Sequence, residues 1–136
     1  MSSKKSRAEL SGIHVVVIDD NEDARTIMKM VLEAHGAFVI VAASARDGLA
    51  TLGQIAPDIV VVDLTMPTED GYWFIGQLKA QRRDGGGSPP PAIAVGAVGE
   101  DESNTAMRAG FDAFVPKPVE VDRLCEAIQR LASKKS

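Results

Sequence analysis

The sequence has few of the residues that would cross-link it, bind soft metals or hold it in a membrane. It contains one cysteine, Cys125, and two histidines in 136 residues, so an internal disulfide is excluded and zinc is not indicated. No run approaches the length of about 18 apolar residues that a membrane span needs. The N-terminal lysines are not followed by the apolar segment of a secretory signal. These absences predict a cytoplasmic protein with no membrane partner.

The sequence also lacks an excess of positive charge. The net charge is −4 at pH 7, whereas nucleic-acid binding requires a basic surface, so we expect no direct nucleic-acid partner. The length fits one domain with a sizeable core, because 45% of the residues are hydrophobic. We expect a flexible basic tail over residues 1–10, one domain over 11–132 and a short tail over 133–136.

Apolar runs alternate with helical patterns along the chain. The predicted strands are 13–18, 37–42, 58–63, 92–97 and 112–115, and a helical segment follows each. In the first helical segment Ala24, Ile27, Met28, Val31 and Leu32 recur at helical spacing. Continuously apolar strands separated by helices predict a parallel sheet covered on both faces. We therefore expect an α/β doubly wound, flavodoxin-like three-layer sandwich, with five parallel strands in the order 2-1-3-4-5 and five helices.

Charged residues gather where these strands end. Asp19 and Asp20 follow the first strand, Asp63 ends the third, and Lys117 follows the fifth. In this fold the reactive centre lies outside the carboxyl ends of the strands, so three carboxylates would share one crevice with one ammonium group. Such crowding raises pKa values unless a cation intervenes, and hard oxygen ligands favour Mg²⁺. Asp63, central in the sheet, is the best candidate for a nucleophile towards phosphorus.

Each of these residues has an ordinary structural interpretation when taken alone. An aspartate after a strand is more often a helix cap or turn residue, and a lysine between prolines is often only exposed. Acids at two adjacent strand ends with a lysine at a third are hard to obtain by chance. The combination therefore favours a site.

The chain resembles the receiver domains of bacterial response regulators, of which the chemotaxis shuttle protein is the best-known single-domain example. The resemblance rests on "VVVIDDNED" (15–23), "DIVVVDLTMPTEDGY" (58–72) and "AGFDAFVPKPVE" (109–120). With the order of strands and helices it covers residues 13–132. The D-x-x-M-P-x-x-D-G pattern and the K-P pair are specific in combination.

This resemblance implies a role for each site residue. Asp63 would be the phosphoacceptor, Asp19 and Asp20 the acidic pair for Mg²⁺, the carbonyl of Thr65 a further metal ligand, and Lys117 the contact to the phosphoryl group. Phe114 falls at the position of the family's switch aromatic, and the Lys117–Pro118 bond is expected to be cis.

The resemblance also implies partners. A histidine kinase or phosphotransfer protein would donate the phosphoryl group, and a downstream protein target or output domain would read it. The reading face would be helix four, strand five and helix five, through which receivers also form homodimers. No enzymatic activity is implied beyond self-catalysed phosphotransfer and dephosphorylation.

One position departs from the family pattern. The family has Ser or Thr at the end of strand four, where this chain has Gly96, or Val95 if the alignment slips by one. Losing one hydrogen bond to a charged oxygen costs roughly 1.5–3 kcal/mol. We therefore predict that phosphate is accepted but that the conformational response is muted. The alternative is an atypical receiver that acts as a docking module without phosphorylation.

Two enzyme or cofactor functions remain as further alternatives. An aspartyl-phosphate phosphatase commonly has a second Asp two residues after the nucleophile, where this chain has Thr65. A flavodoxin needs a Ser/Thr/Gly-rich anion cradle after strand one, and "DDNED" is the opposite. Turnover of a phosphomonoester would revive the first, and a coloured protein the second.

Overall fold

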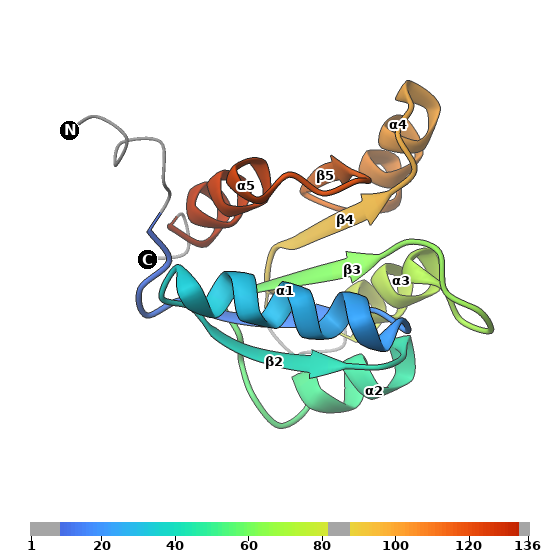
Figure 1. Ribbon diagram of the computed structural model, residues 1–136. Helices are drawn as coiled ribbons and strands as arrows, with labels where there is room; N and C mark the ends of the chain where they lie inside the picture. The colour runs from blue at the N-terminus through green and yellow to red at the C-terminus, as the bar shows by residue number, and fades with distance from the viewer. Residues whose placement is uncertain (1–8, 82–87, 134–136) are drawn as a thin grey trace.

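The computed structural model describes residues 9–81 and 88–133 as five strands and five helices in alternation (Figure 1). The elements, in chain order, are β1 (His14–Ile18), α1 (Glu22–Ala34), β2 (Phe38–Ala42), α2 (Ala45–Leu52), β3 (Ile59–Asp63), α3 (Gly71–Gln81), β4 (Ala92–Gly96), α4 (Glu100–Ala109), β5 (Ala113–Pro116) and α5 (Val121–Ser133). All strand pairs are parallel, and the strand order is β2-β1-β3-β4-β5. The predicted fold class is confirmed.

The strands are apolar at nearly every position, and β3 and β4 are buried along their whole length. Alternate residues such as Val15 and Val61 face α1 and α5, where they pack with Leu32 and Leu124. The intervening residues face α2, α3 and α4. Figure 1 shows α1 and α5 on the near side of the sheet. This arrangement leaves the carboxyl ends of the strands uncovered at one edge, where ligands bind in such folds.

Polar side chains at the start of α1, α2 and α3 cap these helices. Asn21 caps α1 by accepting a hydrogen bond from the Ala24 N–H at 2.8 Å. Ser44, which the sequence pattern predicts as an N-cap, caps α2 by accepting from the Asp47 N–H at 3.0 Å. Asp70 accepts from the Trp73 N–H at 3.0 Å at the start of α3. Each cap satisfies a backbone donor that the first helical turn leaves unpaired.

Several predicted boundaries differ from the structure. Leu10 falls in the predicted tail over residues 1–10, yet its side chain is fully buried and its N–H donates to the His35 carbonyl at 2.9 Å. Leu10 packs in the same core cluster as Val15 and Leu32, and the folded unit therefore includes Leu10. The last helix begins at Val121, whereas the sequence pattern predicts a start at Val119. Residues 1–8 and 134–136 of the predicted tails lie outside the described residues. So do residues 82–87 of the Gly- and Pro-rich segment 82–91, which the sequence predicts to be a loop.

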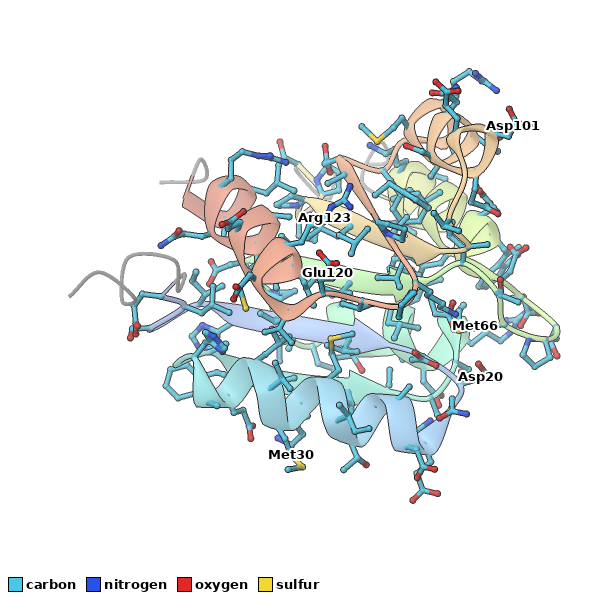
Figure 2. The ribbon with its side chains drawn as sticks, turned by 45° about the horizontal axis from the view of Figure 1, so that its top comes forward. Asp20, Met30, Met66, Asp101, Glu120 and Arg123 are labelled. Atoms are coloured by element: carbon cyan, nitrogen blue, oxygen red, sulfur yellow. The ribbon has the colours of Figure 1, made fainter. Side chains whose placement is uncertain are left out.

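The face of α1 is not entirely part of the core. Ile27, in the predicted apolar stripe with Leu32, the buried residue of α1, is 61% exposed, and Met30 is 64% exposed. Figure 2 shows Met30 projecting from the outer side of this helix. Among the described residues no helix combines the length and the apolarity needed to cross a bilayer.

Candidate functional site

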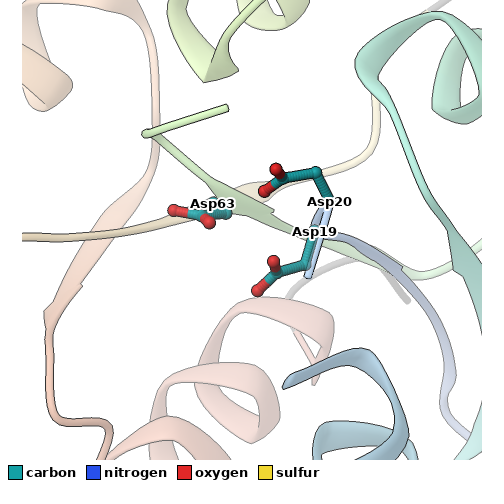
Figure 3. A group of neighbouring side chains, drawn as sticks. All are labelled: Asp19, Asp20 and Asp63. Atoms are coloured by element: carbon teal, nitrogen blue, oxygen red, sulfur yellow. The ribbon is translucent and has the colours of Figure 1, made fainter. Parts of the chain in front are cut away.

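Three carboxylates meet at the carboxyl end of the sheet. Asp19 and Asp20 directly follow β1, and Asp63 is the last residue of β3, the neighbouring strand. One oxygen from each lies within 4.8 Å of the others. Figure 3 shows all three carboxyl groups projecting into the same space. The expected convergence of acids from separate strands is therefore present.

Asp63 lies at the centre of this cluster and is buried, with 6% of its surface exposed. Its Oδ1 accepts a hydrogen bond from Lys117 Nζ at 3.0 Å and another from the Thr65 N–H at 3.1 Å. Lys117 follows β5 and is half-exposed. A buried carboxylate needs such partners, because desolvation without them is costly.

Asp19 is positioned by the turn that begins α1. Its Oδ1 accepts from the Asn21 N–H at 2.9 Å, and its carbonyl accepts from Arg25 Nη1 at 3.0 Å. Burial raises the pKa of Asp19, and the neighbouring Asp63 carboxylate raises it further, against the bond from Asn21 and the charge of Lys117. The ionised form of Asp19 is therefore disfavoured in this setting.

Asp20 is the exposed member of the cluster. Figure 2 shows Asp20 and Met66 at the same end of the sheet. Both line a shallow hollow together with Ser44 and Glu69. The exposed side of Asp20 thus opens the cluster to solvent.

The donor set fits Mg²⁺. Three carboxylate groups supply hard oxygen atoms close together. Burial raises the pKa of Asp19 most, and the negative charges of Asp63 and Asp20 raise it further. Thr65 contacts Asp63 through its backbone N–H, which donates a hydrogen bond to Asp63 Oδ1. Its carbonyl, expected as a further ligand, stays a prediction.

Gly71 lies very close to the backbone of Asp63 and Leu64, a contact that the sequence pattern does not predict. A Cβ at this position would lie 2.9 Å from the Asp63 carbonyl oxygen and 3.0 Å from the Cα of Leu64. Only glycine lets α3 begin so close to the end of β3. The D-G pair of the motif therefore has a structural role, with Asp70 as the cap and Gly71 as the contact.

An apolar groove of about 510 Å³ adjoins the cluster and extends between α1 and α5. Asp63 and Lys117 lie at one end, and Ile27 and Val119 are among the side chains that line it. The exposure of Ile27 is thus explained by its position on the groove rather than in the core.

The remaining predicted residues also lie near the cluster. Gly96 is the last residue of β4, and Val95, the preceding residue, pairs with Asp63. The Gly96 carbonyl accepts from the Lys117 N–H at 2.8 Å. Phe114 of β5 is half-buried, and the Lys117–Pro118 bond is cis as expected.

The family described as "Response regulator receiver domain" matches residues 15–129. An uncharacterised 14.6 kDa protein of Leptolyngbya boryana is 34% identical over 122 residues, which cover 89% of this chain and 91% of that protein. The sensor histidine kinase AtsR of Burkholderia thailandensis is 34% identical over 125 residues, which are 89% of this chain but 20% of the kinase. A Francisella response regulator receiver domain has the same fold, with a TM-score of 0.83 at 23% identity over 92% of this chain and 100% of that one.

The fold and the match together define a signalling domain of two-component systems. The chain belongs to the response regulator receiver domain family. It spans nearly all of the Leptolyngbya protein but only a fifth of AtsR, so the family occurs both as a short protein and within a longer one.

Proposed function

We propose that this domain accepts a phosphoryl group on Asp63 and passes the signal on through protein contacts. The observation that carries the proposal is the arrangement around Asp63: a buried carboxylate 3.0 Å from Lys117, with Asp19 and Asp20 close by. A carboxylate in this setting serves as a nucleophile when the charge of the incoming group is neutralised.

The chemistry is an exchange of one phosphoryl bond for another. An oxygen of Asp63 attacks phosphorus, the bond from phosphorus to the donor nitrogen breaks, and its electron pair remains on the departing imidazole. Water later attacks the same phosphorus and releases inorganic phosphate, which restores the carboxylate. Lys117 would shift from its bond with Asp63 to an oxygen of the transferred group.

Asp19, Asp20, Asp63 and the carbonyl of Thr65 would hold Mg²⁺. When bound, Mg²⁺ neutralises charge on the phosphoryl oxygens. Asp19 would be held in place by its bond from the Asn21 N–H. We infer that metal binding also relieves the mutual repulsion of the carboxylates.

The proposed donor is a histidine kinase or a phosphotransfer protein, and the proposed reader is a downstream protein or an output domain. The name of the relative AtsR as a sensor histidine kinase is compatible with a phosphorelay. The face formed by α4, β5 and α5 would contact the reader or a second copy of this chain, and Met107 of α4 is exposed there. We place the domain in the cytoplasm, where such donors act, and assign it no enzymatic role beyond self-catalysed phosphotransfer and dephosphorylation.

The test is phosphorylation by a small acyl phosphate in the presence of Mg²⁺, followed by intact mass. We expect wild-type protein to gain one phosphoryl group, and Asp63→Asn to gain none. Asp47→Asn is the matched control, because Asp47 is an exposed acid on α2 outside the cluster. No gain in wild type, or an equal gain in Asp63→Asn, would contradict the proposal.

A second function, docking without phosphorylation, is favoured by one observation. Gly96 supplies no hydroxyl at the end of β4, so one expected contact to the phosphoryl group is missing. A protein that binds its partner equally before and after phosphorylation, or that never takes up phosphate, would establish this function instead.

A further inference from the structure

The space beside Gly96 is filled. Gly96 is buried at the end of β4. A Cβ added there would lie 2.8 Å from Leu64 Cδ1, 3.3 Å from Phe114 Cε1 and 3.5 Å from Glu102 Cγ. Neighbouring side chains from three elements or loops therefore occupy the place of the missing side chain.

Leu64 is the residue of this contact that lies next to Asp63, the proposed phosphoacceptor. It directly follows Asp63 and is 3% exposed. Its N–H donates to the Val95 carbonyl at 2.9 Å, and its carbonyl accepts from the Gly71 N–H at 3.3 Å. The backbone of Leu64 is therefore bonded to β4 and to the start of α3, while Leu64 follows Asp63 directly in the chain.

The other two side chains beside Gly96 belong to β5 and α4. Phe114 belongs to β5, and Glu102 lies in the first turn of α4, where its carboxylate accepts a hydrogen bond from the Tyr72 hydroxyl. Gly96 itself is bonded through its carbonyl to the N–H of Lys117. The contact between Leu64 and Gly96 thus lies between the ion pair of Asp63 and Lys117 on one side and β5 and α4 on the other.

We propose that Leu64 is a positioning residue that transmits a change at Asp63 to Phe114 and α4 by packing across Gly96, in place of a hydroxyl on β4. Close-packed side chains pass on small displacements because no void absorbs them. This inference rests on the proposed phosphorylation of Asp63. A Cβ at Gly96 would require Leu64 to shift, because it would lie 2.8 Å from Leu64 Cδ1.

The packing is tested first without phosphate, by thermal unfolding of Gly96→Ala in two backgrounds. With Leu64 present the added methyl collides, and we expect the midpoint temperature to fall by about 3–6 °C. In Leu64→Ala, or in the milder Leu64→Val if Leu64→Ala does not fold, the same change should be neutral or stabilising. Gly76→Ala is the control, since nothing lies within 4 Å of a Cβ there, and its effect should be equal in both backgrounds. Equal effects of Gly96→Ala in both would overturn the inference.

Transmission is tested by amide hydrogen exchange of α4 and β5 with and without acyl phosphate and Mg²⁺, compared at matched phosphoryl occupancy. We expect exchange in α4 and β5 to change in wild type and in the volume-conserving Leu64→Met, and the change to be lost in Leu64→Ala or Leu64→Val. A full response in the truncated variants, or none in phosphorylated wild type, would overturn the inference. If no variant takes up phosphate, the proposed function fails, and so does transmission, while the unfolding experiment still reports on the packing.

Discussion

At the scale of single residues, the carboxylates of the acidic cluster repel one another when they are ionised. Asp19 is partly desolvated and faces Asp63, so its pKa is raised. Because the pKa in the folded protein lies above the unfolded value of 3.8, the stability that Asp19 contributes is fully present below that value and is lost as the pH rises through the folded pKa. At neutral pH without metal, ionised Asp19 therefore lowers the stability of the fold.

We predict that Asp19→Asn raises the stability of the metal-free protein at neutral pH. The change removes the repulsion while the amide oxygen still accepts from Asn21, and the gain should be about 0.5–1 kcal/mol because solvent screens this half-buried site. Mg²⁺ should stabilise wild type in thermal unfolding and stabilise Asp19→Asn much less. Asp47→Asn should respond to Mg²⁺ as wild type does, and a lower midpoint for metal-free Asp19→Asn would disprove this account.

The residue scale also changes how the missing hydroxyl at Gly96 should be tested. Restoring it by Gly96→Thr alone would push a Cβ to 2.8 Å from Leu64 Cδ1. The single variant would therefore combine a gained hydrogen bond with a steric clash. Gly96→Thr in the Leu64→Ala background separates the two, and it distinguishes the muted response expected from the sequence from the response carried by Leu64.

At the scale of elements, α4 contributes little to the core. Ala106 is its single buried residue among those described, and its first turn carries three acids, Glu100, Asp101 and Glu102. The Tyr72 hydroxyl of α3 donates to Glu102, and the Tyr72 ring packs edge-on against Phe111 with centroids 6.4 Å apart. Burial and then the Glu102 carboxylate raise the pKa of Tyr72, which keeps the donor protonated.

We predict that Tyr72→Phe loosens α4 more than the rest of the chain. The ring contact with Phe111 is kept, while the lost hydrogen bond should cost about 0.5–1.5 kcal/mol. Hydrogen exchange should accelerate in α4 and remain near wild type in α1, which is the internal control. A uniform acceleration across the helices would show that the bond does not hold α4 in particular.

At the scale of the whole molecule, the core under α5 contains the single thiol. Burial raises the pKa of Cys125 to about 11, with smaller contributions from Asp122 and Glu126. The pKa lies above the value of 9.0 for the free group, so the contribution of Cys125 to stability is present below pH 9.0 and is lost as the pH rises towards 11.

We predict that the protein loses up to about 2–3 kcal/mol of unfolding free energy across this alkaline interval through Cys125. Urea unfolding at about pH 7.5 and about pH 10 should show roughly half of this loss in wild type, because pH 10 lies midway between the two pKa values, and a smaller loss in Cys125→Ala. Tyr72 titrates in the same direction, so Tyr72→Phe is measured alongside. An identical pH dependence in wild type and Cys125→Ala would exclude the thiol as the cause.

The amino-acid sequence by itself determined the order of the elements, the parallel sheet and the ends of the strands at which the acids stand. These follow from local pattern: apolar runs such as residues 58–63 make buried strands, and residues such as Ser44 cap the helices that follow them. It also brought Asp19, Asp20, Asp63 and Lys117 to one edge, because parallel strands end at the same side of a sheet.

Only the tertiary structure decided which of these groups touch and what fills the gaps between them. That Lys117 bonds Asp63 at 3.0 Å, that Ile27 faces a groove and that Leu64 covers Gly96 depends on side-chain packing between elements distant in the chain. No local pattern encodes such contacts, because each is set by sheet register and by the volumes of neighbours contributed from elsewhere in the sequence.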